Sequence, residues 1–429
     1  MSERSIEQVL AYEALDSRGT PTVACVVTLA GGAQGCAIVP AGASTGRHEA
    51  HERRDGGERY GGRGVLAAVE AVNGEIAPSL RGSDAADQTA IDAGLRALDG
   101  TPSLERLGAN AVLAASVACA LAAAEAARRP LWSSLAPPGA APLLPRPMVN
   151  LLSGGAHAGR AIDVQDVLVI PLAATTFAAA IEHASLVRAG TAAELRERGH
   201  DTALVADEGG LAAPLASNEE ALEVATRGIE RAGVGAALAL DVAATQLADG
   251  DGGYRLARED RLLDGPALAR EVAGWARRYP LVSIEDPLGE DDWEAWRLVT
   301  ELLGADVQLL GDDLFATSSE RLGRGIAAGV ANAVLVKPNQ AGTLSDARSA
   351  LELARSAGYA MVVSARSGDS EDAWLADLAV GWRSGQIKVG STQRSERTAK
   401  WNRLLRIEAE CPDAELAPWS VASPRSSTV

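Results

Sequence analysis

Several apolar stretches in the second half of the 429-residue sequence end on a single charged residue. Burying a charge is costly unless it is paired or binds a ligand, so one such residue alone usually indicates a structural ion pair. Here the pattern occurs five times, which favours a shared functional site. The stretches are LALD, VSIE, VQLLGD, VLVK and QIK, and their last residues are Asp241, Glu285, Asp312, Lys337 and Lys388.

These residue types suit metal-assisted proton removal. Three carboxylates form a set of hard oxygen ligands of the kind that Mg²⁺ prefers, and Mg²⁺ usually keeps coordination positions for water or substrate. A lysine that is desolvated or close to another cation has a lowered pKa and can accept a proton. A lysine such as Lys337 near a divalent cation suggests removal of a proton next to a carboxylate, with the metal stabilising the charge that develops.

Such a site requires elements that bring distant strand ends together. After Pro147, short β-branched runs alternate with helical patterns such as residues 217–233, which predicts a parallel β/α barrel with outer helices. In these barrels the carboxyl ends of the strands meet at one mouth, where the five charged residues would converge. The expected strands are residues 167–171, 203–207, 237–241, 281–285, 307–312, 333–337, 361–365 and 385–389.

The first part of the chain has a different pattern. Residues 5–40 predict strands, residues 40–57 form a polar, glycine-rich segment that we expect to be a mobile loop, and residues 64–128 have helical periodicity. Five prolines in residues 136–147 predict a linker. We expect a cap domain at residues 1–135, a linker at 136–147 and a barrel at 148–429.

The composition argues against several classes of partner. Lys and Arg total 40 against 57 Asp and Glu, which disfavours a general nucleic-acid binder or a protein of anionic membrane surfaces. The four cysteines include no CxxC pair, so neither a zinc site nor a disulfide framework is expected. The N-terminus lacks a secretory apolar core, and the apolar residues 109–127 are mostly alanine, which predicts a packed helix. We expect a cytoplasmic protein.

From about Ala11 to Glu408 the sequence resembles the enolase family. The matching motifs, in order, are LDSRGTPTV, PAGASTG, GGAHAG, ADEGG, ALDVAAT, SIEDP, GDDL, VKPNQAGT, SARSG and GQIKVGS. The resemblance implies an α+β cap and an eight-stranded β/α barrel, a modified TIM barrel whose second strand is reversed. It also implies a hydro-lyase that converts 2-phosphoglycerate to phosphoenolpyruvate with two Mg²⁺ ions, and a homodimer or higher homo-oligomer.

The resemblance assigns roles to individual residues. Asp241, Glu285 and Asp312 match the ligands of the metal that binds the substrate carboxylate. Lys337 matches the base at carbon 2, and Glu208 matches the acid that assists departure of the hydroxyl from carbon 3. The remaining matches are Lys388 for the substrate carboxylate, Arg366 and Ser367 for the phosphate, Ser44 for the second metal and the substrate, and Ala43, His157 and Gln165 as further substrate contacts.

Two positions depart from the family pattern. The family's SHRSG reads SARSG here, so Ala365 replaces a histidine at a substrate-binding position. Its DIQEF-type motif reads DVQDV, so Asp166 replaces a catalytic glutamate and is one methylene shorter. Both positions belong to the side of the site that handles the hydroxyl and its water. Losing one preorganised polar group of this kind costs about 3–4 kcal/mol of transition-state stabilisation.

Three hypotheses follow from these departures. The leading one is a specialised enzyme with an enlarged pocket, similar to the carboxyphosphonoenolpyruvate synthases of phosphonate antibiotic biosynthesis, which would remove water from a glycerate with a phosphonoformyl group at carbon 2. The second is an ordinary phosphopyruvate hydratase with unusual residues around its site. The third is a catalytically weak, enolase-like binding protein, and the retained metal ligands, Lys337 and Glu208 argue against it. The expected substrate in the first two is a small anionic phospho- or phosphonoglycerate.

Overall fold

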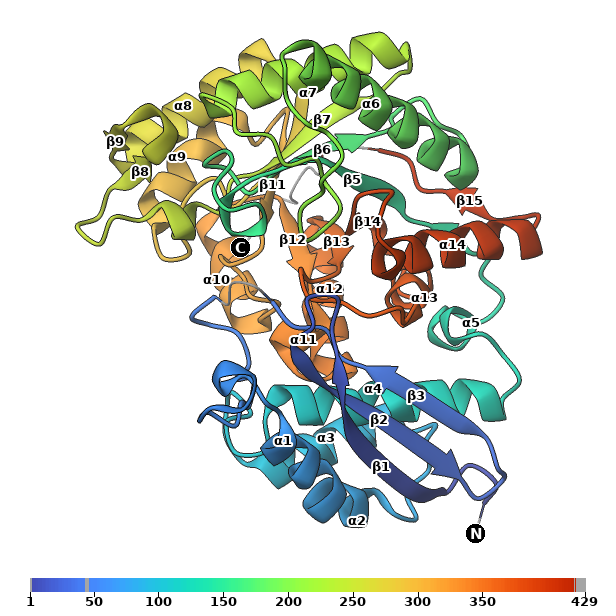
Figure 1. Ribbon diagram of the computed structural model, residues 1–429. Helices are drawn as coiled ribbons and strands as arrows, with labels where there is room; N and C mark the ends of the chain where they lie inside the picture. The colour runs from blue at the N-terminus through green and yellow to red at the C-terminus, as the bar shows by residue number, and fades with distance from the viewer. Residues whose placement is uncertain (1, 43–45, 420, 422–429) are drawn as a thin grey trace.

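The computed structural model describes residues 2–42, 46–419 and 421, and it places a small cap beside a larger barrel (Figure 1). The cap holds an antiparallel sheet in the order β1-β2-β3, with a tight turn between β2 and β3. The strands are β1 (Ile6–Leu15), β2 (Pro21–Leu29) and β3 (Gln34–Ile38). The cap helices are η1 (Arg59–Gly62), α1 (Leu66–Ala71), η2 (Val72–Ile76), α2 (Ala77–Leu80), α3 (Gln88–Asp99), α4 (Ala109–Ala126) and α5 (Leu131–Leu135).

Helix α4 is the core element of the cap. It lies across β2 and β3, and its alanine-rich surface lets the sheet approach closely (Figure 1). A side chain at Gly35 of β3 would meet the backbone oxygen of Ala118 at 2.1 Å, so glycine is required there. Within the described residues, α4 is the one helix long and apolar enough to cross a membrane by length and composition, and 78% of it is buried inside the protein. That burial is typical of a core helix.

The barrel is closed by eight strands in the order β10-β11-β12-β13-β14-β5-β6-β7. Strand β6 runs antiparallel to both of its neighbours, and every other neighbouring pair is parallel. The reversed second strand that the family resemblance implied is therefore confirmed. The strands are β5 (Arg146–Ser153), β6 (Asp166–Ile170), β7 (Ala237–Asp241), β10 (Leu281–Glu285), β11 (Gln308–Gly311), β12 (Ala333–Val336), β13 (Ala360–Ser364) and β14 (Gly385–Gly390).

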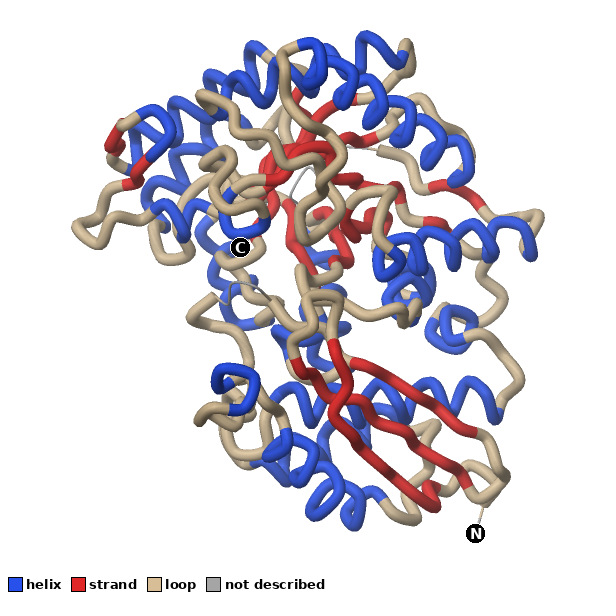
Figure 2. Tube along the Cα trace, viewed as in Figure 1, coloured by secondary structure: helices blue, strands red, loops and turns tan. Residues whose placement is uncertain are grey.

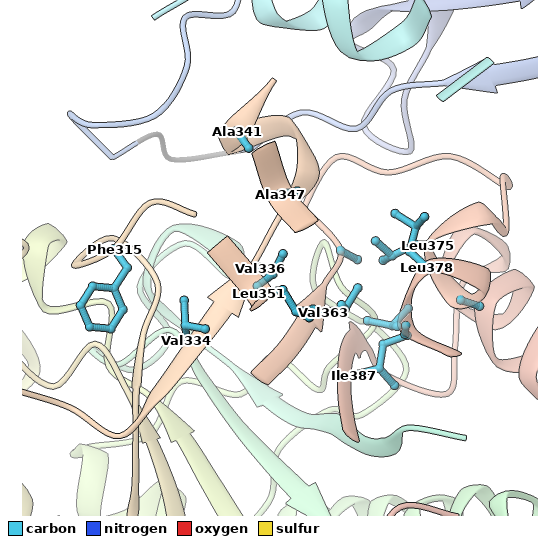
Figure 3. Close-up of a cluster of buried hydrophobic side chains, with 14 of the residues drawn as sticks. Phe315, Val334, Val336, Ala341, Ala347, Leu351, Val363, Leu375, Leu378 and Ile387 are labelled. Atoms are coloured by element: carbon cyan, nitrogen blue, oxygen red, sulfur yellow. The ribbon is translucent and has the colours of Figure 1, made fainter. Parts of the chain in front are cut away.

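Helices surround the barrel strands, which Figure 2 shows in red inside a ring of blue helices. Alternate strand residues point inward and outward. Val334 and Val336 of β12 belong to the large buried cluster that includes Leu351 of α12 (Leu344–Ala357), and Figure 3 shows Val336 beside Leu351. Leu335, between them, belongs to the separate cluster inside the barrel. The helices are α6 (Phe177–Glu197), α7 (Asn218–Ala232), α8 (Gly265–Arg278), α9 (Trp293–Leu303), α10 (Ser319–Ala328), α11 (Pro338–Ala341), α12 (Leu344–Ala357), α13 (Trp374–Gly381) and α14 (Ser395–Glu410).

Short elements fill the connections. The proline-rich residues 136–147 contain β4 (Leu143–Leu144), which pairs with β15 (Glu415–Leu416), and the first residues of β5. The expected strand at 203–207 is wrong, because this segment makes an isolated bridge from Val205 to Leu211 and no barrel strand. The eighth barrel strand is instead β5, which was not among the expected strands. The remaining short elements are η3 (Gly155–His157), η4 (Ala244–Leu247), η5 (Ala257–Glu259) and the hairpin of β8 (Tyr254–Leu256) with β9 (Arg261–Leu263).

Candidate active site

The five charged residues predicted at strand ends do meet at one mouth of the barrel. Asp241 and Glu285 are the last residues of β7 and β10, Asp312 and Lys337 directly follow β11 and β12, and Lys388 lies within β14. A cavity at this mouth is lined by Asp241, Asp312, Lys337 and Lys388 together with other predicted site residues. The β/α arrangement therefore collects groups from strands far apart in the sequence.

Lys388 joins two of the carboxylates. Its Nζ atom lies 2.6 Å from Oδ2 of Asp241 and 2.7 Å from Oε2 of Glu285, and all three side chains are almost fully buried. Burial alone lowers the pKa of Lys388, but the two carboxylates outweigh it and raise the pKa well above the ordinary lysine value. Lys388 is therefore a fixed positive charge at neutral pH, suited to holding an anionic substrate group.

Lys337 forms an ion pair with Asp312 and lies at the edge of the cavity. Burial lowers the pKa of Lys337, but Asp312 outweighs burial, so the net shift is upward. The Asp312 carboxyl is also buried, yet Lys337 holds its pKa below the ordinary value. Lys337 can act as a base only when the negative charge of Asp312 is compensated by another cation.

Acidic groups at the mouth could hold a divalent ion. Among the described residues, Asp286, Asp312 and Asp313 place ligand atoms within 4.8 Å of one another. Asp241 and Glu285 are not part of this group, and both pair with Lys388. The predicted set of Asp241, Glu285 and Asp312 still supplies three hard carboxylate oxygens from adjacent strands, a donor chemistry that fits Mg²⁺.

A second group of titratable residues forms the opposite wall. Asp166 begins the reversed strand β6 and is paired in register with both Ser153 and Asp241, which brings it to the mouth. Its carboxylate accepts a hydrogen bond from Oγ of Ser153 at 2.6 Å and pairs with Nδ1 of His157 at 2.9 Å. Glu208 lies nearby, where Nδ2 of Asn150 donates to its carboxylate at 3.1 Å.

The carboxylates on this wall favour the protonated form of His157. Burial alone lowers the pKa of His157, but Asp166 and Glu208 outweigh burial and raise it to about 9. Burial tends to raise the pKa of Glu208, but His157 and nearby cations outweigh it and lower that pKa below its ordinary value. At neutral pH His157 therefore carries a proton, while Glu208 is a carboxylate in this arrangement. Nδ1 of His157 pairs with Asp166, so Nε2 is the ring nitrogen that can contact a ligand in the cavity.

The raised pKa of His157 gives a direct prediction. Nuclear magnetic resonance titration of the five histidines should show His157 titrating near pH 9. Its folded pKa exceeds the unfolded value of 6.5, so its contribution to the free energy of unfolding is fully present below pH 6.5 and is lost as the pH rises through about 9.

A pair of variants separates the causes of this shift. Asp166→Asn should lower the pKa of His157 by more than about one unit, because the carboxylate charge is removed. Ser153→Ala removes only a hydrogen bond to Asp166 and should leave His157 titrating above pH 8 or so. A wild-type His157 that titrates below pH 7 would contradict this description.

The residues predicted to bind phosphate lie on a third side. Arg366 follows β13, and its buried guanidinium pairs with Glu49 of the cap at 2.8 Å and donates to the side-chain oxygen of Asn339 at 3.2 Å. Ser367 is buried beside it and accepts a weak hydrogen bond from Arg18 at 3.4 Å. Both residues line the same cavity as Lys337.

Ala365 also lines the cavity. It follows β13, its backbone N–H donates to the carbonyl of Lys388 at 2.9 Å, and it is 6% exposed. The backbone of the SARSG motif therefore reaches the mouth, and a methyl group stands where the family has an imidazole. This wall consequently lacks the polar side chain that a histidine would supply at that position.

Gln165 is held beside the metal-ligand candidates. Its Nε2 donates to Asp241 at 3.0 Å, and its carbonyl oxygen accepts from Gln246 at 2.8 Å. It is thus placed to orient the Asp241 carboxylate. The predicted contacts Ala43 and Ser44 lie outside the described residues.

Several residues at the site were missed from the sequence, and three of them bear directly on its chemistry. Glu49 comes from the cap loop, where no periodic pattern marked it. Arg397 at the start of α14 donates to the carbonyls of Arg366 and Ser367 at 2.7 Å and 2.6 Å, which fixes the phosphate-side backbone. Asp286 accepts from the backbone N–H groups of Asp312 and Asp313 and has a left-handed φ of 39°. The motif SIEDP contained this signal, since a second acid directly follows Glu285.

Comparison with known proteins gives matches over nearly the whole chain. The model of the enolase N-terminal domain matches residues 6–135, and the model of the enolase C-terminal TIM barrel domain matches residues 141–420. The enolase of Sulfurimonas denitrificans is 48% identical over 409 residues, which cover 94% of this chain and 96% of that protein. The enolase of Acidothermus cellulolyticus is 49% identical over 424 residues, which cover 98% of each chain.

The capped barrel and its acid–base mouth define a hydro-lyase of the enolase superfamily. With both domains matched and nearly half of the residues identical to those of full-length relatives, the chain belongs to the enolase family. The family and the fold class expected from the motifs are confirmed. Both relatives carry the name enolase, so the comparisons favour an ordinary hydratase over our leading hypothesis of a phosphonate-pathway enzyme.

Proposed function

We propose that the protein dehydrates 2-phosphoglycerate to phosphoenolpyruvate with two Mg²⁺ ions. The observation that carries this proposal is the single cavity in which Lys337, Lys388, Asp241 and Asp312 face the wall of Glu208. These groups are the ones needed to remove a proton beside a carboxylate and to assist the departure of a hydroxyl. The names of the two relatives point in the same direction.

Lys337 takes the proton from carbon 2 in this proposal. Burial already favours its neutral form, and Asp312 is the group that opposes it. When bound to the carboxylates, Mg²⁺ would compensate the charge of Asp312 and stabilise the negative charge that develops on the substrate carboxylate. Lys388 is placed to hold that carboxylate, because its ammonium group is buried and permanently charged.

Departure of the hydroxyl completes the reaction. The bond between carbon 3 and oxygen breaks, a double bond forms between carbons 2 and 3, and the oxygen leaves as water with one added proton. His157 is the protonated group on this wall, and Glu208 can bind the leaving hydroxyl or pass a proton to it. Arg366 and Ser367 would hold the phosphate, since both line the cavity and Arg366 offers a bidentate fork.

A second candidate function is supported by the shortened wall at Asp166 and Ala365. With a methyl group in place of an imidazole, a bulkier substituent at carbon 2 could be accommodated beside Ala365. Water elimination from a glycerate with a phosphonoformyl group would then give carboxyphosphonoenolpyruvate. The same base, metal ligands and leaving-group wall serve both reactions.

Turnover of 2-phosphoglycerate tests the proposal directly. With Mg²⁺ present, we expect kcat of about 1–10³ s⁻¹, the usual range for enzymes, followed by the absorbance of phosphoenolpyruvate. Conversion of the phosphonoformyl compound without conversion of 2-phosphoglycerate would replace the proposal by the second candidate. Binding of both compounds without conversion of either would support the third hypothesis, an enolase-like binding protein.

Restoring the family's histidine makes a further prediction. Ala365→His should raise kcat/KM for 2-phosphoglycerate by about 10²-fold, because a preorganised polar group returns to the site. Ala365→Leu is the control, since it adds an apolar side chain of similar reach without a donor, and it should give no gain. An equal response of the two variants would show that volume alone matters at this position.

The proposal also includes the setting of the enzyme. We infer a cytoplasmic homodimer or higher homo-oligomer, built from a cap at residues 1–135, a linker and a barrel, and the boundary between linker and barrel, expected at 147/148, moves to Arg146, where β5 begins. The domain division is supported by the ranges of the two family models, 6–135 and 141–420. Light scattering of the purified protein would measure the oligomeric state.

A further inference from the structure

One acidic residue at the mouth has no part in the proposed reaction. Glu49 belongs to the cap, yet its side chain lines the same cavity as Lys337 and Arg366. Its carboxylate accepts two hydrogen bonds from the guanidinium of Arg366, 2.8 Å from Nη1 to Oε2 and 3.3 Å from Nη2 to Oε1. The Glu49 and Arg366 side chains are only 7% and 4% exposed, so this is a buried, two-pronged ion pair.

The backbone around Glu49 is fixed on both sides of the contact. The N–H of Gly46 donates to Oε1 of Glu49 at 2.8 Å, which locks the side chain against its own loop. The N–H of Ala50 donates to the carbonyl of Gln340 at 2.9 Å, so the loop is tied to α11 directly after Lys337. The carboxylate therefore occupies a defined position in the cavity.

The chemistry of this pair resembles that of a bound ligand. A guanidinium presents a planar fork that fits a carboxylate or a phosphate in the same two-pronged way. Arg366 cannot offer the same fork to Glu49 and to a phosphate group at once. A phosphate placed beside a buried glutamate would also face the repulsion of a like charge.

We propose that Glu49 is an internal occupant of the anion subsite at Arg366, and that an incoming phosphate or phosphonate group must displace it. The pairing with phosphate rests on the proposed function, whereas the ion pair itself does not. Glu49 supplies the countercharge that a buried Arg366 needs before substrate binds. The same contact weakens anion binding, so Glu49 sets the affinity of the site for the substrate's anionic group.

The test is the binding of inorganic phosphate to the purified full-length protein, measured by calorimetry without substrate. Glu49→Gln keeps the shape of the side chain and its bond from Gly46 but removes the charge. We expect phosphate to bind about tenfold more tightly to this variant, and KM for 2-phosphoglycerate to fall. An unchanged or weaker affinity for phosphate would overturn the proposal.

Two further variants locate the effect. Glu58→Gln is the matched control, because Glu58 is an exposed acid in the same cap loop and is not among the residues that line the cavity, and it should change phosphate affinity less than about twofold. Adding Arg366→Gln to Glu49→Gln should abolish the gain, and a gain that persists would place the phosphate elsewhere and contradict the inference.

Two further outcomes, unfolding of Glu49→Gln and an inactive wild type, still allow the role of Glu49 to be tested. If Glu49→Gln unfolds, Glu49→Asp gives a second route, since it keeps the charge but withdraws the carboxylate from Arg366 by one methylene, and it should also tighten phosphate binding. Failure of wild type to convert 2-phosphoglycerate would refute the proposed function while phosphate binding still decides the role of Glu49.

Discussion

Replacing Lys337 with alanine is expected to lower kcat for dehydration by about 10³- to 10⁴-fold and to stop exchange of the carbon-2 proton with solvent. Lys337 lines the cavity beside Asp312, which outweighs burial and raises the pKa of the amine, so a cation that compensates Asp312 is needed before Lys337 can accept the proton. The measurement is loss of deuterium from substrate labelled at carbon 2, which reports proton removal even when a later step limits turnover.

Lys337→Arg is the decisive companion variant. Arginine keeps a positive charge next to Asp312, but its pKa is so high that it stays protonated and cannot act as a base. Both variants should therefore lose proton exchange, although the arginine variant should retain more of the folding stability. Exchange that survives in Lys337→Arg would mean that Lys337 contributes only charge, and another base would have to be sought.

The lysine content of the chain strengthens this assignment. The sequence has only three lysines, Lys337, Lys388 and Lys400, while arginine supplies the other basic residues. Their side chains are 12%, 6% and 1% exposed, so none is an ordinary surface lysine. Lys400 donates to Asp369 and to backbone carbonyls, which explains it structurally. At the mouth, an amine that can lose a proton provides chemistry that arginine cannot.

The strand-end residues could be predicted because two local rules agree. A short apolar run with β-branched residues predicts a barrel strand, and a charged residue at its carboxyl end lies at the mouth of a parallel barrel. Asp241 and Glu285 obey both rules, and Lys337 follows its strand by one residue. Their convergence follows from topology alone, without any knowledge of side-chain contacts.

Asp166 shows where this reasoning fails. It begins its strand, so an all-parallel barrel would place it at the far end from the mouth, and only the reversal of β6 brings it beside Asp241. Alternation of strands and helices carries no signal for that reversal, which came from the family resemblance. The ALVAD run at 203–207 misled for a related reason: its pattern is strand-like, but Leu204 is 74% exposed and the barrel is already closed by β5 and β6.

Glu49 shows a second limit. It meets Arg366 across 317 positions of sequence, between the cap and the barrel. No local pattern marks such a contact, because it depends on how the two parts pack together. The sequence pattern therefore predicted the site residues that lie on barrel strands, and it missed Glu49, which the cap contributes to the same cavity.

Removal of divalent metal is expected to abolish dehydration, and Mg²⁺ should restore it. Adding Mg²⁺ to chelator-treated protein should also stabilise the fold, by about 2.7 kcal/mol at a concentration of 100 times Kd. Burial and Asp241 raise the pKa of Glu285 well above its ordinary value, so this carboxyl retains a proton in the arrangement described here. Mg²⁺ binding should therefore release protons, which calorimetry in buffers of different ionisation enthalpy can count.

Asp241→Asn tests which residues hold that metal. The change replaces one of three hard carboxylate ligands by a neutral amide, so it should weaken Mg²⁺ binding by about 100-fold or more and remove most of the thermal stabilisation. Asp249→Asn is the matched control, because Asp249 lies on the loop that follows β7, away from the cavity, and caps backbone N–H groups that asparagine can also cap. Equal Mg²⁺ affinities in the two variants would move the metal to Asp286, Asp312 and Asp313, which already place their oxygens within 4.8 Å of one another.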